Sequence, residues 1–289
     1  MGPVLVVGAS GNVVGSAVRA LAGRGLQVRA AATSPGRLQL GVPVVRLDLS
    51  DPSTFAAAVA GADGLFLMRP PAIARVAGTL NAFLDVAERH GVRHVVFSSV
   101  AGADTNRVVP HHRVETHLQA SSMGWTILRP GFFAQNLADA YRVDVVGDRR
   151  LLLPAGEGRV AFVDTRDVGD VVGLVLADPE AHRGAGYTLT GSRAIGFAEV
   201  AAMLGGELGD PVTYQPVSPW TYATHVHARG LPWAQALVQT VLHTGLRYGQ
   251  AERVDPTLAD LLGRPPRTLE AYIHEHRRTW STDTAVRPA

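Results

Sequence analysis

The sequence lacks two residue types that many enzymes use in catalysis. It has 289 residues, contains no cysteine, and has no lysine, so that all 27 basic residues are arginine. The absence of cysteine excludes thiol catalysis, disulfide bonds and cysteine-ligated zinc. The absence of lysine excludes a Schiff base, a lysine general acid and a lysine that binds phosphate. Any site in this chain must therefore use other side chains.

Strong net charge and long apolar runs are missing too. The formal net charge is +2, and the arginines are scattered without a basic stripe, so we expect no nucleic-acid partner. No apolar run reaches the roughly 18 residues of a membrane span, so we expect no membrane partner. The first predicted strand begins at residue 4, which leaves no room for a signal peptide. We therefore expect a soluble, cytoplasmic protein.

The apolar run at residues 4–7 ends in a glycine-containing turn, and an amphipathic segment follows to about residue 24. A buried strand, a tight turn and a helix start are the context of a dinucleotide-binding loop, because the helix N-terminus binds a pyrophosphate. The candidate cofactor-binding residues of this loop are Gly8, Ser10, Gly11, Asn12 and Val13. A regular glycine spacing would place a third glycine at position 14, where this chain has Val14. We expect a slight shift of the helix or weaker cofactor binding, and no loss of binding in a Val14→Gly variant.

Apolar strands alternate with helical segments through the first half of the chain. Strands are predicted at residues 4–7, 26–32, 42–47, 64–68, 92–98 and 125–128, and helices at 16–24, 52–60, 72–89 and 110–120. Continuous apolar strands are typical of a parallel sheet covered by helices on both faces. We predict an α/β fold with a doubly wound parallel sheet, in which residues 1–130 form a Rossmann dinucleotide-binding core. A helix within residues 163–182 is expected to pack back on this core.

Residues 131–289 are predicted to form mainly a smaller, mostly helical C-terminal lobe that binds the substrate. Most tyrosines and tryptophans fall in this half, among them Tyr222. They either close over an aromatic or apolar substrate or pack a helical subdomain. The histidine pairs at 225 and 227 and at 274 and 276 do not share a helical face, so we expect no metal site. Asp164 and Asp167 are interpreted as helix-capping residues.

Several short motifs, in order, resemble the NmrA-like group of atypical short-chain dehydrogenases/reductases. The resemblance covers roughly residues 3–205 and rests on Gly-Ala-Ser-Gly-Asn-Val at 8–13, Asp-Leu-Ser-Asp at 48–51, Val-Phe-Ser-Ser-Val at 96–100, Trp-Thr-Ile-Leu-Arg-Pro-Gly-Phe-Phe at 125–133, and Phe-Val-Asp-Thr-Arg-Asp-Val at 162–168. It implies a Rossmann fold with bound NADP or NAD. It also implies either reduction of quinones, azo dyes and similar acceptors, or redox sensing without catalysis.

The segment after the second strand favours NADP(H) over NAD(H). NAD-selective folds usually place a carboxylate there for the ribose 2′-hydroxyl, and NADP-selective folds an arginine for the 2′-phosphate. Residues 30–37 contain no carboxylate, whereas Thr33, Ser34 and Arg37 offer donors to a phosphate. The resemblance adds Asp48 and Leu49 near the adenine. Relatives often have arginine where this chain has Thr33.

The nicotinamide end is expected at the carboxyl ends of the central strands, where such sheets bind their ligands. This predicts cofactor contacts from Met68, Arg69 and Ser98 and a substrate contact from Ser99. The resemblance places Phe132, Phe133 and Asn136 at the floor of the active site.

The chain has no Tyr-x-x-x-Lys proton-donating pair, because lysine is absent. The helix after the fifth strand carries His111 and Glu115, four residues apart on one face. A histidine with a pKa near neutrality and oriented by a carboxylate is a candidate proton donor. The alternative is that His111 caps the helix and Glu115 is exposed.

Three functions fit this sequence. The first is an NAD(P)H-dependent reductase of a quinone, azo or aromatic polyketide-type acceptor, which needs little more than placement of the nicotinamide. The second is an NADP(H) redox sensor without catalysis. The third is an isomerase or cyclase of a small metabolite that uses His111 or Tyr222 without net redox change. The oligomeric state is open, and a homodimer is one option.

Overall fold

The computed structural model describes residues 2–8, 11–37 and 39–280, and the chain divides into two compact units. The first unit comprises Met1–Pro130, Thr165–Leu189 and Thr257–Arg264. The second comprises Gly131–Asp164, Thr190–Pro256 and Pro265–Ala289. After residue 130, two further segments of the chain, 165–189 and 257–264, therefore belong to the first unit. The sequence analysis predicted a contribution from the first of these segments and none from the second.

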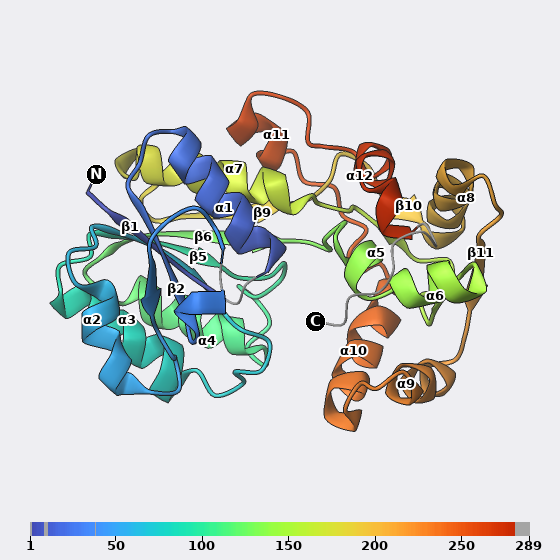
Figure 1. Ribbon diagram of the computed structural model, residues 1–289, viewed down its shortest axis with the longest axis horizontal. Coiled ribbons are helices and arrows are strands. Elements are labelled where there is room, and N and C mark those ends of the chain that lie inside the picture. The colour runs from blue at the N-terminus through green and yellow to red at the C-terminus, as the bar shows by residue number, and fades with distance from the viewer. Residues whose placement is uncertain (1, 9–10, 38, 281–289) are drawn as a thin grey trace. The chain divides into compact units, whose positions relative to one another are not determined.

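The first unit is built on a seven-stranded sheet in which every neighbouring pair is parallel, with the order β3-β2-β1-β4-β5-β6-β9 (Figure 1). Its strands are β1 (Val4–Val7), β2 (Val28–Ala32), β3 (Val44–Arg46), β4 (Gly64–Met68), β5 (His94–Ser98), β6 (Gly124–Pro130) and β9 (Ala185–Leu189). The order runs outward in both directions from β1 and β4, as in a doubly wound fold. The predicted fold class is confirmed.

Helices cover both faces of this sheet, as Figure 1 shows. One face carries α1 (Asn12–Gly23) and α7 (Thr165–Ala177), and the other carries α2 (Phe55–Val59), α3 (Ala82–Arg89) and α4 (Pro110–Gln119). The sequence predicted all five, and α7 lies within the predicted residues 163–182.

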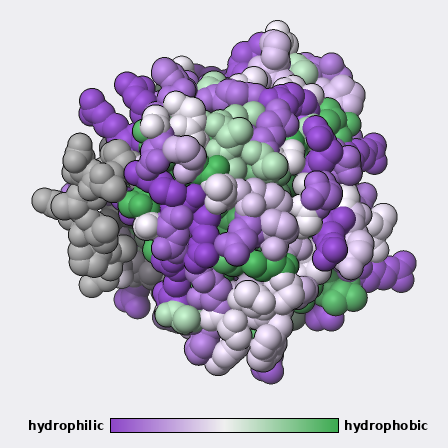
Figure 2. Space-filling view, turned by 90° about the vertical axis from the view of Figure 1, so that its right-hand side faces the viewer, coloured by the Kyte–Doolittle hydropathy of each residue, from purple (hydrophilic) through white to green (hydrophobic). Residues whose placement is uncertain are grey.

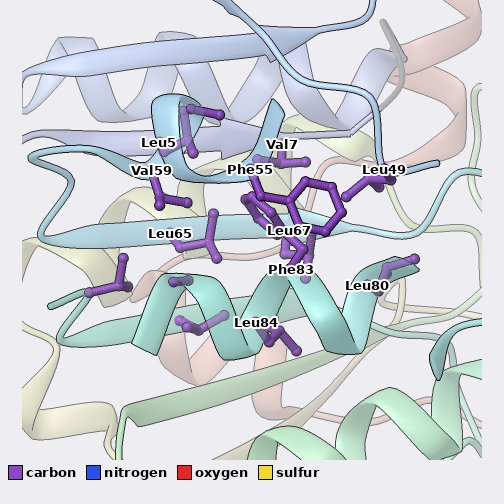
Figure 3. Close-up of a cluster of buried hydrophobic side chains, with 14 of the residues drawn as sticks. Leu5, Val7, Leu49, Phe55, Val59, Leu65, Leu67, Leu80, Phe83 and Leu84 are labelled. Carbon is purple, nitrogen blue, oxygen red and sulfur yellow. The ribbon is translucent and has the colours of Figure 1, made fainter. Parts of the chain in front are cut away.

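Alternate side chains of each strand enter opposite layers, because successive residues of a strand point to opposite faces. Leu5 and Val7 of β1 pack with Leu65 and Leu67 of β4 beneath α2 and α3, where Phe83 is fully buried (Figure 3). Burying one such side chain contributes about 1.5–3 kcal/mol. This core fixes the strands and, with them, the loops that leave their carboxyl ends.

The two helices on the other face approach closely because α7 carries two glycines. A Cβ on Gly169 would lie 2.6 Å from the backbone of Ser16, and one on Gly173 would lie 3.2 Å from Ala20. Both contacts are on α1, so these glycines set the distance between α1 and α7.

Position 14 holds a closely packed valine, and the expected effects on helix position and cofactor binding stay predictions. The Val14 side chain is buried and packs against Gly8, where a Cβ would lie 2.9 Å from Val14 Cγ2 and 3.1 Å from Met68 Cβ. The valine fills the space that a third glycine would have left, and Gly8 makes room for it. The Val14 side chain therefore occupies the space beside Gly8, and Val14→Gly would leave that space empty.

The helix predicted at residues 72–89 begins later than expected. A turn of π-helix at Ala77–Asn81, labelled η3, leads into α3, and residues 72–76 are not helical. The Arg69 side chain holds this non-helical stretch, because its Nη1 donates to the carbonyl oxygens of Pro71 and Ile73 at 3.2 and 2.6 Å.

The second unit is mostly helical and carries two small two-stranded sheets. Its helices are α5 (Asn136–Asp139), α6 (Arg142–Asp148), α8 (Phe197–Leu208), α9 (Pro219–Ala228), α10 (Trp233–Leu246) and α12 (Leu269–Glu275). Its strands are β7 (Arg150–Leu153), β8 (Arg159–Val160), β10 (Ile195–Gly196) and β11 (Thr213–Pro216). The sequence analysis missed α5, α6 and β10. The remaining helix, α11 (Thr257–Leu262), belongs to the first unit and packs on α7 and β9.

Large hydrophobic side chains are exposed along α10. They are Trp233, Leu237, Val238, Val241 and Leu242. On the face of the molecule drawn in Figure 2, hydrophobic residues form separate patches among hydrophilic ones. None of the helices in the described ranges is both long enough and apolar enough to cross a bilayer.

Candidate functional site

The parallel register brings the predicted cofactor-binding segments to one edge of the first unit. Val7 of β1 pairs with Ala31 of β2 on one side and with Leu67 of β4 on the other, and Met68 pairs with Ser98 of β5. The loops that leave these four strands therefore start side by side. This edge is the carboxyl end of the sheet, where doubly wound folds bind their ligands.

The first loop at this edge leads directly into α1. Gly11 is the N-cap residue of α1 and makes no side-chain cap hydrogen bond. Asn12 is exposed, whereas Val13 is buried and presents only its backbone to a ligand. Ser10 lies outside the described residues. A helix start with glycine as its N-cap residue fits a pyrophosphate.

The segments after β2 and β3 flank this loop. Thr33 and Ser34 are exposed, and Arg37 ends the short 3-10 helix η1 (Pro35–Arg37), although its side chain lies outside the described part. Asp48 Oδ1 accepts a hydrogen bond of 2.8 Å from the Ser50 backbone N–H. Leu49 is buried in the core, so only its backbone is available to a ligand.

A buried ion pair lies behind the ends of β5 and β6. The Arg129 guanidinium donates to both carboxylate oxygens of Glu115, with Nη2 2.7 Å from Oε2 and Nε 3.1 Å from Oε1. The Ser99 hydroxyl donates to Glu115 Oε1. We call Ser99, Glu115 and Arg129 the charged cluster. Because the Ser99 proton is directed at Glu115, the Ser99 oxygen presents lone pairs to any ligand at this edge.

His111 has a different partner from Glu115. Arg69 Nε donates to His111 Nε2 at 3.2 Å, so the ring proton of a neutral His111 lies on Nδ1. Burial, followed by the charge of Arg69, lowers the pKa of His111 to about 4. The ring is therefore neutral at pH 7.

Two expectations for this helix are wrong. The pKa of His111 is not near neutrality, and the carboxylate four residues along does not orient the ring, because it is bound to Ser99 and Arg129. The alternative of an exposed Glu115 is wrong too, since Glu115 is 2% exposed. The sequence analysis gave no role to Arg129, although it quoted the motif that contains it. An arginine inside an apolar strand was the signal.

The residues expected at the floor of the active site belong to the second unit. Phe132 packs edge-on against Phe162 at a centroid distance of 5.6 Å and against His243 at 5.8 Å. Phe133 is half-buried and forms a bridge to Val163. Asn136 is the first residue of α5, and its backbone N–H donates a hydrogen bond to the Phe133 carbonyl.

Tyr222 lies inside a buried cluster of this unit. The Tyr222 hydroxyl accepts a hydrogen bond of 2.9 Å from Gln239 Nε2, and Tyr222 is 1% exposed. His243 Nδ1 donates to the Gln239 carbonyl at 2.7 Å, so Nε2 accepts from the Tyr141 hydroxyl. We call Tyr141, Tyr222, Gln239 and His243 the aromatic cluster.

Burial sets the protonation states of the aromatic cluster. It lowers the pKa of His243 to about 4 and raises the pKa of Tyr222 well above its ordinary value. Tyr222 is therefore a poor proton donor in this environment. The sequence analysis missed Tyr141 and His243, because 102 residues separate them in the chain.

The histidine pairs of the tail diverge as expected. His225 binds Asp144 at 2.9 Å, whereas His227 stacks on Trp233 at a centroid distance of 4.1 Å. Across the described ranges, no group of three or more potential ligands could hold a metal ion. Asp167 is fully buried and binds Arg264 Nη2 at 2.7 Å, which ties the start of α7 to the segment after α11.

The chain resembles known proteins over nearly its whole length. The model of the NmrA-like family matches residues 2–273. NAD(P)H azoreductase of Xenophilus azovorans is 31% identical over 281 residues, which cover 94% of this chain and 97% of the relative. The expectation of an oxidoreductase is confirmed by such relatives.

Two solved structures share the fold. The NADPH-dependent quinone oxidoreductase of Escherichia coli, solved with NADPH, is 25% identical, has a TM-score of 0.85, and covers 95% of this chain and 99% of its own. NmrA, a negative transcriptional regulator solved with NAD, is 19% identical, has a TM-score of 0.77, and covers 95% of both chains. One fold thus serves both an oxidoreductase and a regulator.

Proposed function

The chain belongs to the NmrA-like family, and on this premise we propose that it is an NAD(P)H-dependent reductase of a quinone, azo or aromatic polyketide-type acceptor, with NADP(H) preferred. The observation that carries this proposal is the carboxyl edge of the first unit. There the loop at Gly8 and Gly11, the end of β2, and the ends of β4 and β5 meet on one side. Phe132, Phe133 and Asn136 are the proposed acceptor-binding residues, whereas Tyr222, which is 1% exposed, is expected to be structural.

The end of β2 supports the preference for NADP(H). No carboxylate stands between residues 28 and 37 to bind a ribose 2′-hydroxyl or to repel a 2′-phosphate. Thr33 and Ser34 are exposed there, and Arg37 follows in the same turn. We propose that these three residues hold the 2′-phosphate, with Asp48 and the Leu49 backbone near the adenine. The relatives leave the choice open, since NAD occupies one of them.

The charged cluster supports a role at the nicotinamide end. A bound nicotinamide supplies the hydride, and solvent supplies the proton that completes reduction of the acceptor. Glu115 acts as a positioning residue, because Arg129 holds it and it directs the Ser99 proton away from the edge. Ser99 then accepts a hydrogen bond from the ligand. Met68, Arg69 and Ser98 border the same place.

His111 is proposed as a hydrogen-bond donor rather than as an acid. Its ring is neutral at pH 7 and carries its proton on Nδ1, so it can polarise an acceptor oxygen without giving up a proton. His111→Phe is expected to lower kcat about a hundredfold to a thousandfold, the range for removal of one such donor, and to leave the Kd for NADPH unchanged. His117→Phe, at the far end of α4, is the matched control. An unchanged kcat in the His111 variant would remove this residue from the mechanism.

The proposal is tested by turnover and by cofactor binding. NADPH oxidation is followed with a panel of quinones and azo dyes, and we expect at least one acceptor to be reduced. Calorimetry should show tighter binding of NADPH than of NADH. Thr33→Asp should reverse that preference, with NADPH binding weakened at least tenfold, whereas Thr105→Asp in an exposed loop should not. Tight cofactor binding without turnover of any acceptor would contradict the reductase and favour a redox sensor.

A further inference from the structure

The outward side of α10 is apolar, although it faces water. Four consecutive members of this side are 50–71% exposed, namely Leu237, Val238, Val241 and Leu242. They are one, three or four residues apart and therefore share one side of the helix. The residues buried on the opposite side are Ala236, Thr240, His243 and Leu246. A helix that is apolar on its outward side as well is normally covered by another element.

Two exposed tryptophans extend this side at the start of α10. The Trp233 ring stacks on Trp220 of α9 at a centroid distance of 6.1 Å and on His227 at 4.1 Å. The two helices pack against each other within the second unit (Figure 1). Because each ring is held by its neighbour, little side-chain entropy is lost when a partner binds. The α10 face is defined by six residues, which are Trp220, Trp233, Leu237, Val238, Val241 and Leu242.

The α10 face carries no charge. The helix contains no aspartate, glutamate or arginine, and its histidine, His243, is buried and neutral at pH 7. Arg229, which follows α9, is paired with Asp144 at 2.7 Å and with Asp148 at 2.9 Å. In a twofold contact the residues near the axis meet their own copies, so a charge there would repel itself. An uncharged face avoids this repulsion and can pack against a second copy of itself.

The area of the α10 face is sufficient for a dimer. Its six residues leave roughly 600 Å² in contact with water, the upper end of the range for apolar patches on monomers. Two copies packed face to face would bury about 1,200 Å² in total, which is the lower end of the range for stable, specific interfaces. Contacts between identical chains are also more apolar than other interfaces, as this face is.

Other occupants fit the α10 face less well. Small-molecule sites are concave, whereas α10 presents the convex side of a helix. Helices that lie on a bilayer carry basic residues for anionic lipids, and α10 has no arginine. The last nine residues of the chain, 281–289, lie outside the described part and contain one large apolar residue, Val286, which is too few to cover six side chains.

We propose that the α10 face is the contact of a homodimer, in which α10 of one copy packs against α10 of a second copy across a twofold axis. Burial of the six side chains stabilises the dimer, and the Kd for dimerisation is expected in the micromolar range or below. The proposal is independent of the reductase function, because none of the six residues belongs to the proposed cofactor or acceptor site.

The first test is sedimentation equilibrium of the full chain, which should show a dimer. Val241→Arg places two arginines close together near the axis and should raise the dimer Kd at least tenfold, which corresponds to about 1.4 kcal/mol. Val241 is 71% exposed, so the variant should fold and keep its Kd for NADPH. Val143→Arg, at an exposed valine of α6 in the same unit, is the control and should dimerise normally.

Three results of this test would overturn the proposal. A chain that stays monomeric well above micromolar concentrations has no such contact. An unchanged dimer Kd in Val241→Arg would show that the copies meet through another surface. A monomeric chain in which Val241→Arg raises the KM for an acceptor, or abolishes binding to vesicles of anionic lipid, would assign the face to that occupant instead.

The second test uses the absence of cysteine from the chain. A single introduced cysteine can form a disulfide only with a second copy, and only where the two Cα atoms lie about 4.4–6.8 Å apart. After oxidation with copper phenanthroline, at least one of Leu237→Cys, Val238→Cys and Val241→Cys should give a covalent dimer, whereas Val143→Cys should give none. Failure of all three variants to form a covalent dimer would show that the copies do not meet through α10.

Discussion

The charged cluster of the first unit and the aromatic cluster of the second bury polar groups in opposite ways. Ser99, Glu115 and Arg129 hold a full ion pair at the end of two strands. The aromatic cluster contains no charge at pH 7, because burial keeps His243 neutral and its tyrosines protonated. A buried charge depends on its partner far more than a neutral donor does. The comparison therefore predicts that disrupting the charged cluster lowers the free energy of unfolding more than disrupting the aromatic cluster does.

The largest loss is expected for Arg129→Met, which leaves Glu115 buried without its partner. Removing one member of a buried ion pair costs about 3–5 kcal/mol, and urea-induced unfolding measures that loss. Arg193→Met is the control. Its ion pairs are exposed, so the expected loss is below about 1 kcal/mol. Equal losses in the two variants would show that the charged cluster is not tightly held.

Lowering the pH should destabilise the aromatic cluster next most strongly. The folded-state pKa of His243 is about 4, below the unfolded value of about 6.5, so unfolded chains bind the proton first as the pH falls. Stability is full above pH 6.5 and falls by about 2–3 kcal/mol for this residue by pH 4.5. The pKa of His111 is also lowered to about 4, so His111 likewise makes the first unit less stable as the pH falls.

His243→Gln should remove that part of the pH dependence, because the amide does not titrate and its oxygen can still accept from Tyr141. The measurement is the unfolding free energy at several pH values between 7 and 4.5. His90→Gln, at an exposed histidine, should leave the curve unchanged. An identical slope in all three proteins would refute the assignment to His243.

The two clusters also differ in how far the sequence predicts them. The strand ends of the first unit are visible as apolar runs that stop at Gly8, Met68 and Ser98, and parallel pairing brings such ends together. The fold and the position of the site follow from that pattern. The hydrogen-bond partners of the side chains cannot be predicted from that pattern. His111 and Glu115 share a helical face, yet they bind two different arginines. Arg69 and Arg129 reach them from the ends of two different strands.

Fewer contacts and helices of the second unit can be predicted from the sequence. Its cluster joins Tyr141, which precedes α6, to α9 and α10, and nothing local marks Tyr141 and His243 as neighbours. The short helices α5 and α6 were missed, because four to seven residues give too little periodicity. Position 14 shows another limit of the sequence. The motif indicates which residue is usual there, but it does not show that Val14 packs against Gly8.

Tyr141→Phe is expected to cost about 1–3 kcal/mol, because His243 Nε2 loses its donor inside a dry core. Buried Trp280, in the same unit, is expected to report the transition through its fluorescence. Tyr248→Phe, at a tyrosine that is 80% exposed, should change stability little. If both variants lost the same amount, the Tyr141–His243 bond would contribute nothing.

Tyr222→Phe gives the smallest expected effect and decides between two roles for Tyr222. The hydroxyl accepts from Gln239, which is half-buried and can turn to water, so the loss should be about 1 kcal/mol. A purely structural Tyr222 predicts this loss with an unchanged KM for the acceptor. A Tyr222 that binds the acceptor predicts a raised KM instead, with the Kd for NADPH unaffected in both cases. Since the hydroxyl is buried and bonded to Gln239, we expect an unchanged KM. A severalfold rise in KM would instead show that Tyr222 binds the acceptor.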